Sequence, residues 1–436
     1  MTIVIKYIAV ITCSTLVLFN NSFAQEKKAI PDPLSLTEAL SFSVKSHPVL
    51  NQANLDIKSA INSRNELEND HDINAYLEGR LRYIEPASIV TDQTNDDHRV
   101  GVIISKTLYD SGRNTADIDA AKLTIESRKV KKQLVLQQRR LDIMQKFFAV
   151  ILADMNYYRY NEEIATAFIS FDRTQDRLKL GQASDIDVLE KEVAYHEIRY
   201  LRIKSQNDQR KARAELAVAM GRPGDLVTTV TKPTLKEINI KLPEVEFLQK
   251  LALSNNYQLQ VLSKALAAAT QRVEVARNTY GPSVNLEAGS FAYSRERSSY
   301  DELQIGLVMR MPLFTGKRTR TETSKAMTKV HEIKNDIELL KARIETDILS
   351  LWLEFDALKG KLLQMNTQTD FRELYLDRSR AFYELEVKTD LGDAMARVSE
   401  AEKELLETRY SMKLVLTQLE IEVGKRLQEF KKGTVQ

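Results

Sequence analysis

The chain has 436 residues, and its 63 Lys and Arg residues nearly balance its 61 Asp and Glu residues. A formal net charge of +2 gives no electrostatic footprint for nucleic acid, so nucleic-acid binding is excluded as a function. The single cysteine, Cys13, lies in an N-terminal apolar run, and a chain cleaved after that run would have no thiol for disulfides, metal sites or nucleophilic catalysis.

Residues 1–24 have the pattern of a secretory signal peptide. Lys6 supplies the positive region, residues 8–19 supply the apolar region, and Ser22-Phe23-Ala24 is a small-x-small cleavage site. The apolar run is too short to prefer spanning a bilayer. A lipoprotein signal, with Cys13 as the lipidated residue, is the alternative.

Residues 25–220 are predicted to form a first structural repeat. A short helix, a break at His47-Pro48 and a longer helix lead to a β-hairpin at about 75–108. From Asn114 to about Leu180 the sequence contains neither proline nor glycine, which predicts one helix roughly 100 Å long. A turn near 181–185 should then lead into a second long helix.

Residues 244–424 are predicted to form a second repeat, because the strand-to-helix segment 101–113 recurs as 306–318. An inter-repeat linker at 221–243, with three prolines and two glycines, joins the two repeats. Within the second repeat we expect a β-hairpin at about 284–311 and a helical tip near 386–392, followed by a basic C-terminal tail at 425–436.

Apolar residues in the long helical segments recur at alternating spacings of three and four. One series runs from Leu141 to Met155 and another from Ile344 to Met365, and the two superpose at an offset of 207. This 3.5-residue period predicts helices that supercoil against neighbours. Further apolar residues off the seam, such as Phe147, would let each helix contact a second neighbour, as in a closed ring. A soluble helical bundle is the simpler alternative.

Four segments of roughly ten residues alternate apolar and polar side chains, which is typical of an outer-membrane barrel wall and also occurs in soluble sheets. They are Ala75–Ile84, Arg99–Leu108, Val284–Tyr293 and Leu303–Met311. Four strands cannot close a barrel, because the smallest closed membrane barrels have about eight, and an open sheet in lipid would leave edge hydrogen bonds unsatisfied. Several chains must therefore share one barrel if these strands lie in a membrane, and a trimer would supply roughly twelve strands.

No catalytic, metal-binding or cofactor-binding constellation is recognisable in the sequence. The five histidines are scattered without paired metal-ligand spacing, at His47, His71, His98, His196 and His331. The sequence also lacks a phosphate-binding glycine loop and a nucleophile elbow. We therefore expect no enzyme activity, no metal and no cofactor.

Four short motifs, in this order, resemble the outer-membrane efflux protein family, the TolC-like exit ducts. They are the opening Leu36-Thr-Glu-Ala-Leu with His47-Pro48, the junction 108–113, its second copy Pro312-Leu-Phe-Thr-Gly316, and the turn 180–189. The resemblance covers essentially the whole mature chain. It implies a mainly α fold with a small β part: a long α-helical barrel continued by a transmembrane β-barrel, with two internal repeats, four strands per chain and one barrel shared by a homotrimer.

Family resemblance also implies which residues of the periplasmic tips are functional. The tips are expected to contact the pump or adaptor through Leu180, Gly181, Ser184, Asp185, Val387, Thr389 and Asp390. Asp390 and Asp393 lie three residues apart on one helical face and are the main candidates for an acidic periplasmic gate, with Asp185 and Asp187 as the equivalents in the first repeat. Two simpler alternatives are that the tip residues only form the turns, and that the aspartates are solvated residues favoured by a helix dipole.

The resemblance implies a passive exit duct of a tripartite efflux or type I secretion system in the outer membrane of a Gram-negative bacterium, with a large periplasmic part. The implied partners are two further copies of the chain, a periplasmic adaptor, an inner-membrane transporter and outer-membrane lipid. A secreted periplasmic coiled-coil tether or adaptor is the alternative, although a tether has no need of paired ten-residue hairpins in both halves.

Overall fold

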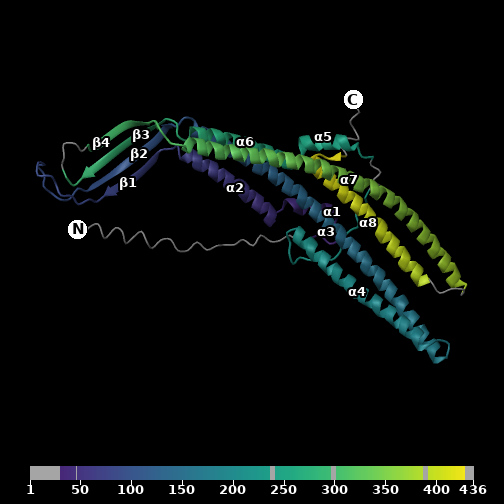
Figure 1. Cartoon of the computed structure of the whole chain (residues 1–436). Helices are drawn as coiled ribbons and strands as arrows, with labels where there is room; N and C mark the ends of the chain where they lie inside the picture. The colour runs from purple at the N-terminus through teal and green to yellow at the C-terminus, as the bar shows by residue number, and fades with distance from the viewer. Residues whose placement is uncertain (1–29, 46, 236–240, 296–300, 386–390, 428–436) are drawn as a thin grey trace, which may run out of the picture.

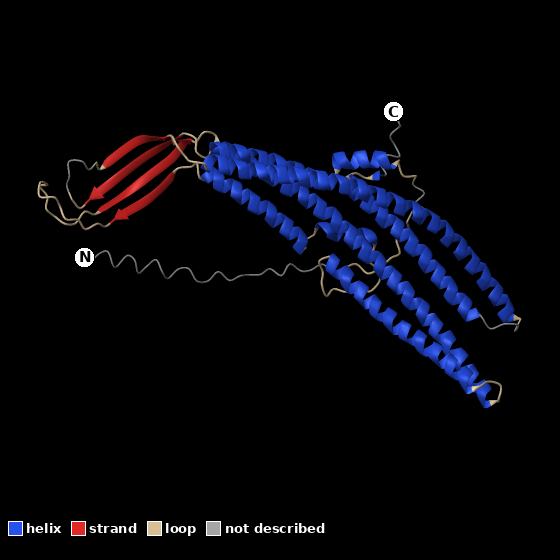
Figure 2. Cartoon of the chain, in the orientation of Figure 1, coloured by secondary structure: helices blue, strands red, loops and turns tan. Residues whose placement is uncertain are grey.

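The computed structural model describes residues 30–45, 47–235, 241–295, 301–385 and 391–427 (Figure 1). The fold is mainly helical with one small sheet, as the sequence predicts. The described chain is elongated, with the sheet at one end and two long helical hairpins extending to the other (Figure 2). The predicted signal peptide at residues 1–24 lies outside the described residues.

The first half contains two short helical segments, a longer helix, a β-hairpin and a long helical hairpin. In chain order these are α1 (Leu36–Ser41), the 3-10 turn η1 (Phe42–Val44), α2 (Pro48–Asn69), β1 (Asn74–Arg80), β2 (Arg99–Tyr109), α3 (Arg113–Lys179) and α4 (Asp185–Ala219). The bounds of α3 agree with the predicted helix to within one residue.

The second half follows the same order of elements. It contains α5 (Val245–Asn255), α6 (Tyr257–Asn278), β3 (Ser283–Tyr293), β4 (Leu303–Arg310), α7 (Arg318–Glu384) and α8 (Leu391–Val423). Helices α3 and α7 each contain 67 residues, so Arg113 corresponds to Arg318. Helix α7 continues through Gly360 without interruption.

Helix boundaries follow from local capping. Ser35 and Glu38 form a capping box at the start of α1, which satisfies backbone donors that a helix N-terminus leaves free. At the start of α2, Pro48 occupies the first turn, where its missing N–H costs nothing, and the His47 side chain accepts from the Val49 N–H. The break predicted at His47-Pro48 is thus the start of α2.

The four strands form one antiparallel sheet in the order β1-β2-β3-β4, so the two hairpins join along β2 and β3. Strand β1 ends at Arg80, which corrects the prediction of a strand to Ile84. Beyond Arg80 the ladder gives way to irregular contacts, in which the backbone N–H of Asp97 donates to the carbonyl of Arg82 and the two side chains form an ion pair.

The long helices pack in the sequence α4, α3, α8, α7, with α3 against both α4 and α8 and α8 against α7. Phe148 of α3 stacks on Tyr410 of α8 with ring centroids 4.0 Å apart, which joins the two halves. Arg213 of α4 pairs with Asp154 of α3 at 2.7 Å. Figure 1 shows the two hairpins separating toward their tips.

The two apolar series of the sequence do not mark equivalent positions. Because Arg113 begins α3 and Arg318 begins α7, the helix bounds give an offset of 205 rather than 207. The offset of 207 arises because both helices present an apolar seam to α8: Phe148 stacks on Tyr410, and Phe355 packs in a buried cluster with Met412. The offset of 207 therefore superposes two similar apolar seams that lie on different faces of the two helices.

Candidate functional site

One face of the sheet is almost entirely apolar. Residues directly opposite one another share a face, so the pairing of Leu77 with Val102 and of Ser290 with Leu303 defines one row of that face. The large apolar side chains on it are 41–73% exposed in the single chain; they are Leu77, Val100, Val102, Ile104, Leu303, Ile305, Leu307 and Met309. A continuous exposed apolar sheet face is the surface that a lipid-facing wall requires.

The opposite face carries charged side chains and a packed aromatic ring. Phe291 is buried because its ring lies over Gly101 and Gly289, where an added Cβ would come within 2.2 Å and 2.6 Å of the ring. The guanidinium of Arg99 lies over the ring at 4.7 Å and also pairs with Glu78. The ring is therefore held flat against the polar side of the sheet.

The first helical tip joins α3 to α4 through a short turn. Leu180 caps α3, and Gly181 adopts a φ of 70°, a left-handed conformation that glycine adopts without steric cost. Ser184 is the N-cap of α4: its Oγ accepts from the Asp187 N–H at 3.2 Å, while the Ser184 N–H donates to Asp187 Oδ2 at 2.8 Å. The Ser184 N–H and the Ser184 hydroxyl both donate to Asp187 Oδ2, and these two hydrogen bonds lower the pKa of Asp187.

Four of the predicted tip residues thus come together at one turn: Leu180, Gly181, Ser184 and Asp185. Leu180 is 71% exposed, and its apolar side chain is available to a partner. Asp187, by contrast, is engaged in the capping box, which gives it a structural role.

The second tip is described only on its α8 side. The predicted residues Val387, Thr389 and Asp390 lie outside the described residues. Asp393 is in the first turn of α8, 65% exposed, and pairs with Arg397 at 3.6 Å. Its neighbour Gly392 lies against Thr166 of α3.

Asp393 and Asp185 are not brought together within one chain. Gly392 lies at the level of Thr166, and α3 continues from there to Lys179, which at 1.5 Å per residue is about 20 Å. The first tip therefore extends beyond the described start of α8, as Figure 1 also shows.

A basic side chain that was not predicted from the sequence, Arg397, lies beside the acidic residues of α8. Arg397 pairs with Asp393 and, at 3.1 Å, with Glu400, while Arg159 of α3 approaches Glu400 at 2.7 Å. The spacing of four residues between Asp393 and Arg397 was the available signal. Basic side chains therefore partly neutralise the carboxylates on this face.

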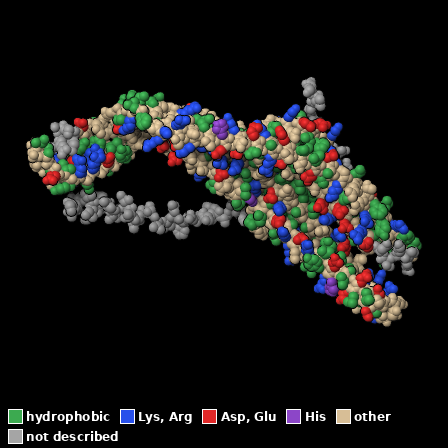
Figure 3. Space-filling model, viewed as in Figure 1, with side chains coloured by type: hydrophobic (Ala, Val, Ile, Leu, Met, Phe, Trp, Pro, Cys, Tyr) green, Lys and Arg blue, Asp and Glu red, His purple; other side chains and the backbone are tan. Residues whose placement is uncertain are grey.

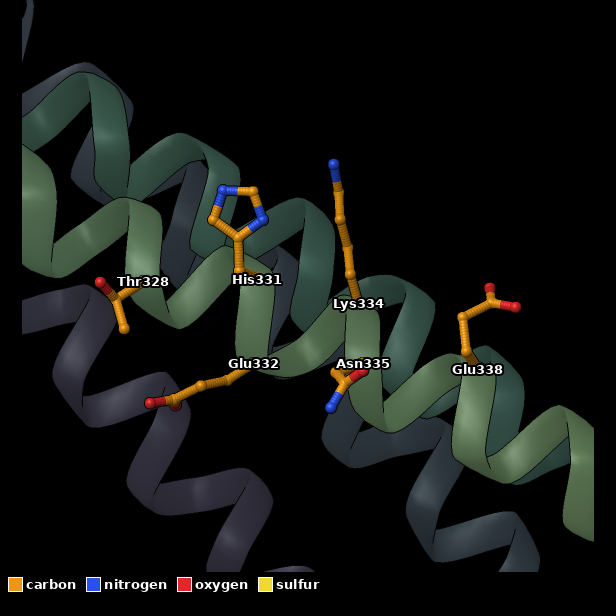
Figure 4. Close-up of a pocket in the computed structure, with 6 residues that line it drawn as sticks. All are labelled: Thr328, His331, Glu332, Lys334, Asn335 and Glu338. Carbon is orange, nitrogen blue, oxygen red and sulfur yellow. The ribbon is translucent and has the colours of Figure 1, made fainter.

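The surface hollows of the described chain do not gather catalytic groups. Figure 4 shows one along α7, in which His331 and Lys334 project to one side of the helix and Glu332 to the other. Among the residues that the structure describes, no group of His, Cys, Asp and Glu side chains could hold a metal ion. Within the same residues, none of the helices has the length and apolarity needed to cross a membrane.

Comparison with known proteins assigns the second half to a family. Residues 248–424 match the outer membrane efflux protein family. The chain is 26% identical over 255 residues to the protein CyaE of Bordetella pertussis, a match that covers 57% of this chain and 53% of that protein. It is 20% identical over 336 residues to the outer membrane protein TolC of Vibrio cholerae, covering 74% of this chain and 76% of TolC. The match thus spans about half the length of the first relative.

The fold is shared with solved outer-membrane channels. The Campylobacter jejuni CmeC outer membrane channel superposes with a TM-score of 0.74 at 12% identity, covering 91% of this chain and 88% of CmeC. The resemblance seen in the sequence is thereby confirmed: the second half of the chain matches the outer membrane efflux protein family, the chain has the fold of TolC-like channels, and it is a protein of the Gram-negative outer membrane.

Proposed function

We propose that this chain is the exit duct of a tripartite efflux or type I secretion system, a passive homotrimeric channel with a β-barrel in the outer membrane and an α-helical barrel in the periplasm. One observation carries the proposal: both layers of the structure end in unpaired edges. The sheet ends at β1 and β4. The helical layer ends at α7 on one side and, on the other, at α2 near the sheet and at α4 toward the tips. Three copies closing both layers into rings would remove all of these edges at once.

Strand direction supports closure. The four strands of one chain alternate in direction, so β4 of one copy runs antiparallel to β1 of the next, and three copies would give a barrel of roughly twelve strands. The apolar face would then contact lipid, and the face with Arg99 and Glu78 would line the lumen.

The proposal includes the domain organisation expected from the sequence. A signal peptide at 1–24 precedes two structural repeats at 25–220 and 244–424, the linker 221–243 joins them, and a basic tail follows at 425–436. Matching element order and the equal lengths of α3 and α7 support the two repeats.

Fractionation tests the duct directly. The full chain should sediment with outer membranes as an SDS-resistant trimer whose mobility changes on boiling. Release with the soluble periplasmic contents would instead support a coiled-coil tether. The family is one of channels rather than enzymes, so we expect no catalytic turnover from the purified trimer.

We further propose that the tips engage a periplasmic adaptor or an inner-membrane transporter. Leu180 is the best position for a photo-reactive residue, since it is exposed and its side chain is not part of the capping box. Cross-linking from position 180 should capture a partner protein in intact cells. Products that contain only this chain would indicate that the tip residues merely form the turn.

A periplasmic gate formed by acidic residues is the final part of the proposal. Asp393 is exposed in the first turn of α8, and Asp390 precedes it by three residues. In a trimer three copies of each carboxylate would surround the axis, attract cations and bind a divalent ion weakly. Asp185 and Asp187 are the less favoured candidates, because Asp187 already caps α4.

Planar-bilayer conductance measures the gate. The Asp390→Asn, Asp393→Asn double variant should lose cation preference and block by periplasmic divalent cations. The Asp377→Asn variant, which removes one exposed charge from α7, is the control and should behave as the native channel. Unchanged cation preference in the double variant would contradict the assignment.

A further inference from the structure

An exposed apolar stripe follows the outer face of α4. Its members recur every three or four residues, the spacing of a coiled-coil seam. They are Ile186, Leu189, Val193, Tyr200 and Ile203, which are 47–77% exposed, with the half-exposed His196 at the intermediate position. The stripe lies away from the face that packs on α3, where Ser205, Ala212 and Leu216 are buried.

A second exposed apolar stripe follows α7, away from its buried seam with α8. Its large side chains are 42–71% exposed; they are Leu349, Leu353, Leu363, Phe371 and Leu374. Gly360 interrupts the stripe and leaves a shallow apolar groove that is also lined by Leu363, Thr367 and Phe371. Two such seams at the two ends of one helical layer each lack a neighbour in the single chain.

The contact between α3 and α8 shows how such a neighbour packs. Ser399 Oγ donates to Glu162 Oε2 at 3.0 Å, and Gly392 lies so close to Thr166 that an added Cβ would be 2.3 Å from the threonine Oγ1. The close contact of Gly392 with Thr166 sets the register of α3 against α8, and the longer Glu162 side chain reaches along the helix to Ser399.

Equivalent positions in the two halves allow this register to be transferred. Arg113 and Arg318 begin α3 and α7, so α3 positions map onto α7 at an offset of 205. Gly221 and Gly424 follow α4 and α8, both with a φ of 75° and both donating their N–H to the carbonyl three residues earlier, so α4 positions map onto α8 at an offset of 203.

The two contacts of α3 with α8 then have counterparts on α7 and α4. The Glu162–Ser399 contact maps onto Thr367 and His196, and the Thr166–Gly392 contact maps onto Phe371 and Leu189. Both counterparts fall on the two exposed stripes. The stripes are identified from side-chain exposure alone, so they support the register independently.

We propose that α7 of one copy packs antiparallel against α4 of the next copy, with Phe371 opposite Leu189 and Thr367 within about one helical turn of His196. The same register places Tyr200 opposite Gly360, at the groove. This inference rests on the homotrimer of the proposed function and specifies its helical interface.

His196 and Thr367 are polar residues within an otherwise apolar interface. A polar residue within an apolar seam fixes register at some cost in stability. In the register given above the His196 imidazole lies within about one helical turn of the Thr367 hydroxyl, whereas a shift of the helices by one heptad would place it against apolar side chains.

Disulfide trapping in the full chain tests the register. Oxidation of the Leu189→Cys, Phe371→Cys double variant in outer membranes should give covalent dimers and trimers that reductant dissolves. The control pair is Leu189→Cys, Gln364→Cys, which is shifted by seven residues or about 10 Å and exceeds the reach of a disulfide. Each single variant should give no ladder. The Tyr200→Cys, Gly360→Cys pair repeats the test at the groove.

The possible results distinguish an incorrect register from the absence of a trimer. A native-mass trimer in which neither matched pair cross-links would overturn the register and leave the duct intact. Equal cross-linking of the shifted pair, or a disulfide confined to single chains, would also overturn it. Absence of any trimer by native mass spectrometry would remove the assembly and the interface together.

Discussion

His47 connects two helices through a single neutral imidazole. Its Nδ1 accepts from the Val49 N–H at 3.2 Å, and its Nε2 lies 3.3 Å from the carbonyl of Val218 near the end of α4, which it can reach only as a donor. Asn256 makes the same two kinds of contact at the start of α6, where it accepts from Gln258 and donates to the carbonyl of Glu422. The first half thus makes this connection with a histidine. The second half makes it with an asparagine amide, which does not titrate.

The His47 contact should weaken in acid. Burial lowers the pKa of His47 from the ordinary 6.5, and the Arg139 cation lowers it further, although the Val218 carbonyl and Asp142 act in the opposite direction. The unfolded chain therefore takes up a proton before the folded chain does. Stability from this group is fully present above pH 6.5 and is lost as the pH falls below that value toward the folded pKa.

Hydrogen exchange at the start of α2 measures this effect. Protection of the Val49 amide in the native trimer should fall as the pH is lowered through the range below 6.5, after correction for intrinsic exchange. The His47→Asn variant, which introduces the side chain that Asn256 supplies in the second half, should retain protection across that range. His331→Asn, at an exposed position on α7, is the control. Identical pH profiles for the native chain and His47→Asn would refute the assignment.

Successive residues of strand β4 alternate between the apolar face and the polar face of the sheet. Ile305 and Leu307 are exposed on the apolar face, whereas Gln304 and Gly306 between them share the other face with Glu287 and Gly289. Figure 3 shows hydrophobic side chains gathered at the sheet end of the molecule, whereas charges of both signs are interspersed along the helices. The hydrophobic face of this element therefore requires an apolar solvent or a partner.

An arginine on each face of β4 distinguishes the two environments. Ile305→Arg should destabilise the inserted protein by about 2–4 kcal/mol if position 305 lies near the bilayer midplane, because a guanidinium would be transferred into hydrocarbon. Gln304→Arg changes the adjacent residue on the proposed lumen face and should insert almost normally. The yield of heat-modifiable trimer in outer membranes, compared at equal expression, reports the difference. Equal yields would argue against a lipid-facing wall.

At the scale of the whole molecule, both layers depend on contacts between the two halves. Strand β2 pairs with β3, and α3 packs on α8, so the sheet and the helical layer are each continuous across the chain. The Phe148–Tyr410 stack and the Arg159–Glu400 pair hold the layer together between its ends. One chain is therefore a single curved body, in which the sheet and the helical layer follow one another end to end, rather than two separable domains.

Removing one hairpin should prevent assembly. Deletion of residues 76–108 takes away two of the four strands, so three copies would supply half the original number and could not close the same barrel. We expect the deletion variant to be absent from outer-membrane fractions. Shortening only the loop 87–94 between β1 and β2 leaves every strand in place and is the matched control. Heat-modifiable trimers of the deletion variant would contradict the closure argument.

The candidate site was only partly predictable. The turn at 181–185 was predictable because Gly181 and the Ser184-x-x-Asp187 pattern are local signals. The pairing of Arg397 with Asp393 could have been inferred from their spacing on one helix. The approach of Arg159 to Glu400 could not, because the two residues belong to different halves of the chain and only the packing of α3 on α8 brings them together.

Local patterns in the sequence are enough to specify the secondary-structure elements of this protein. Long segments without proline or glycine and a 3.5-residue apolar period specify helices, and period-two alternation specifies strands, because both patterns are set by backbone geometry within a few residues. Tertiary packing sets which apolar stripe is buried and where β1 ends, and the folded helix bounds show that an offset of 205 rather than 207 relates α3 to α7. Those features depend on which distant segment covers each face. In a helix with apolar stripes on two sides, the local sequence does not indicate which stripe packs against the same chain.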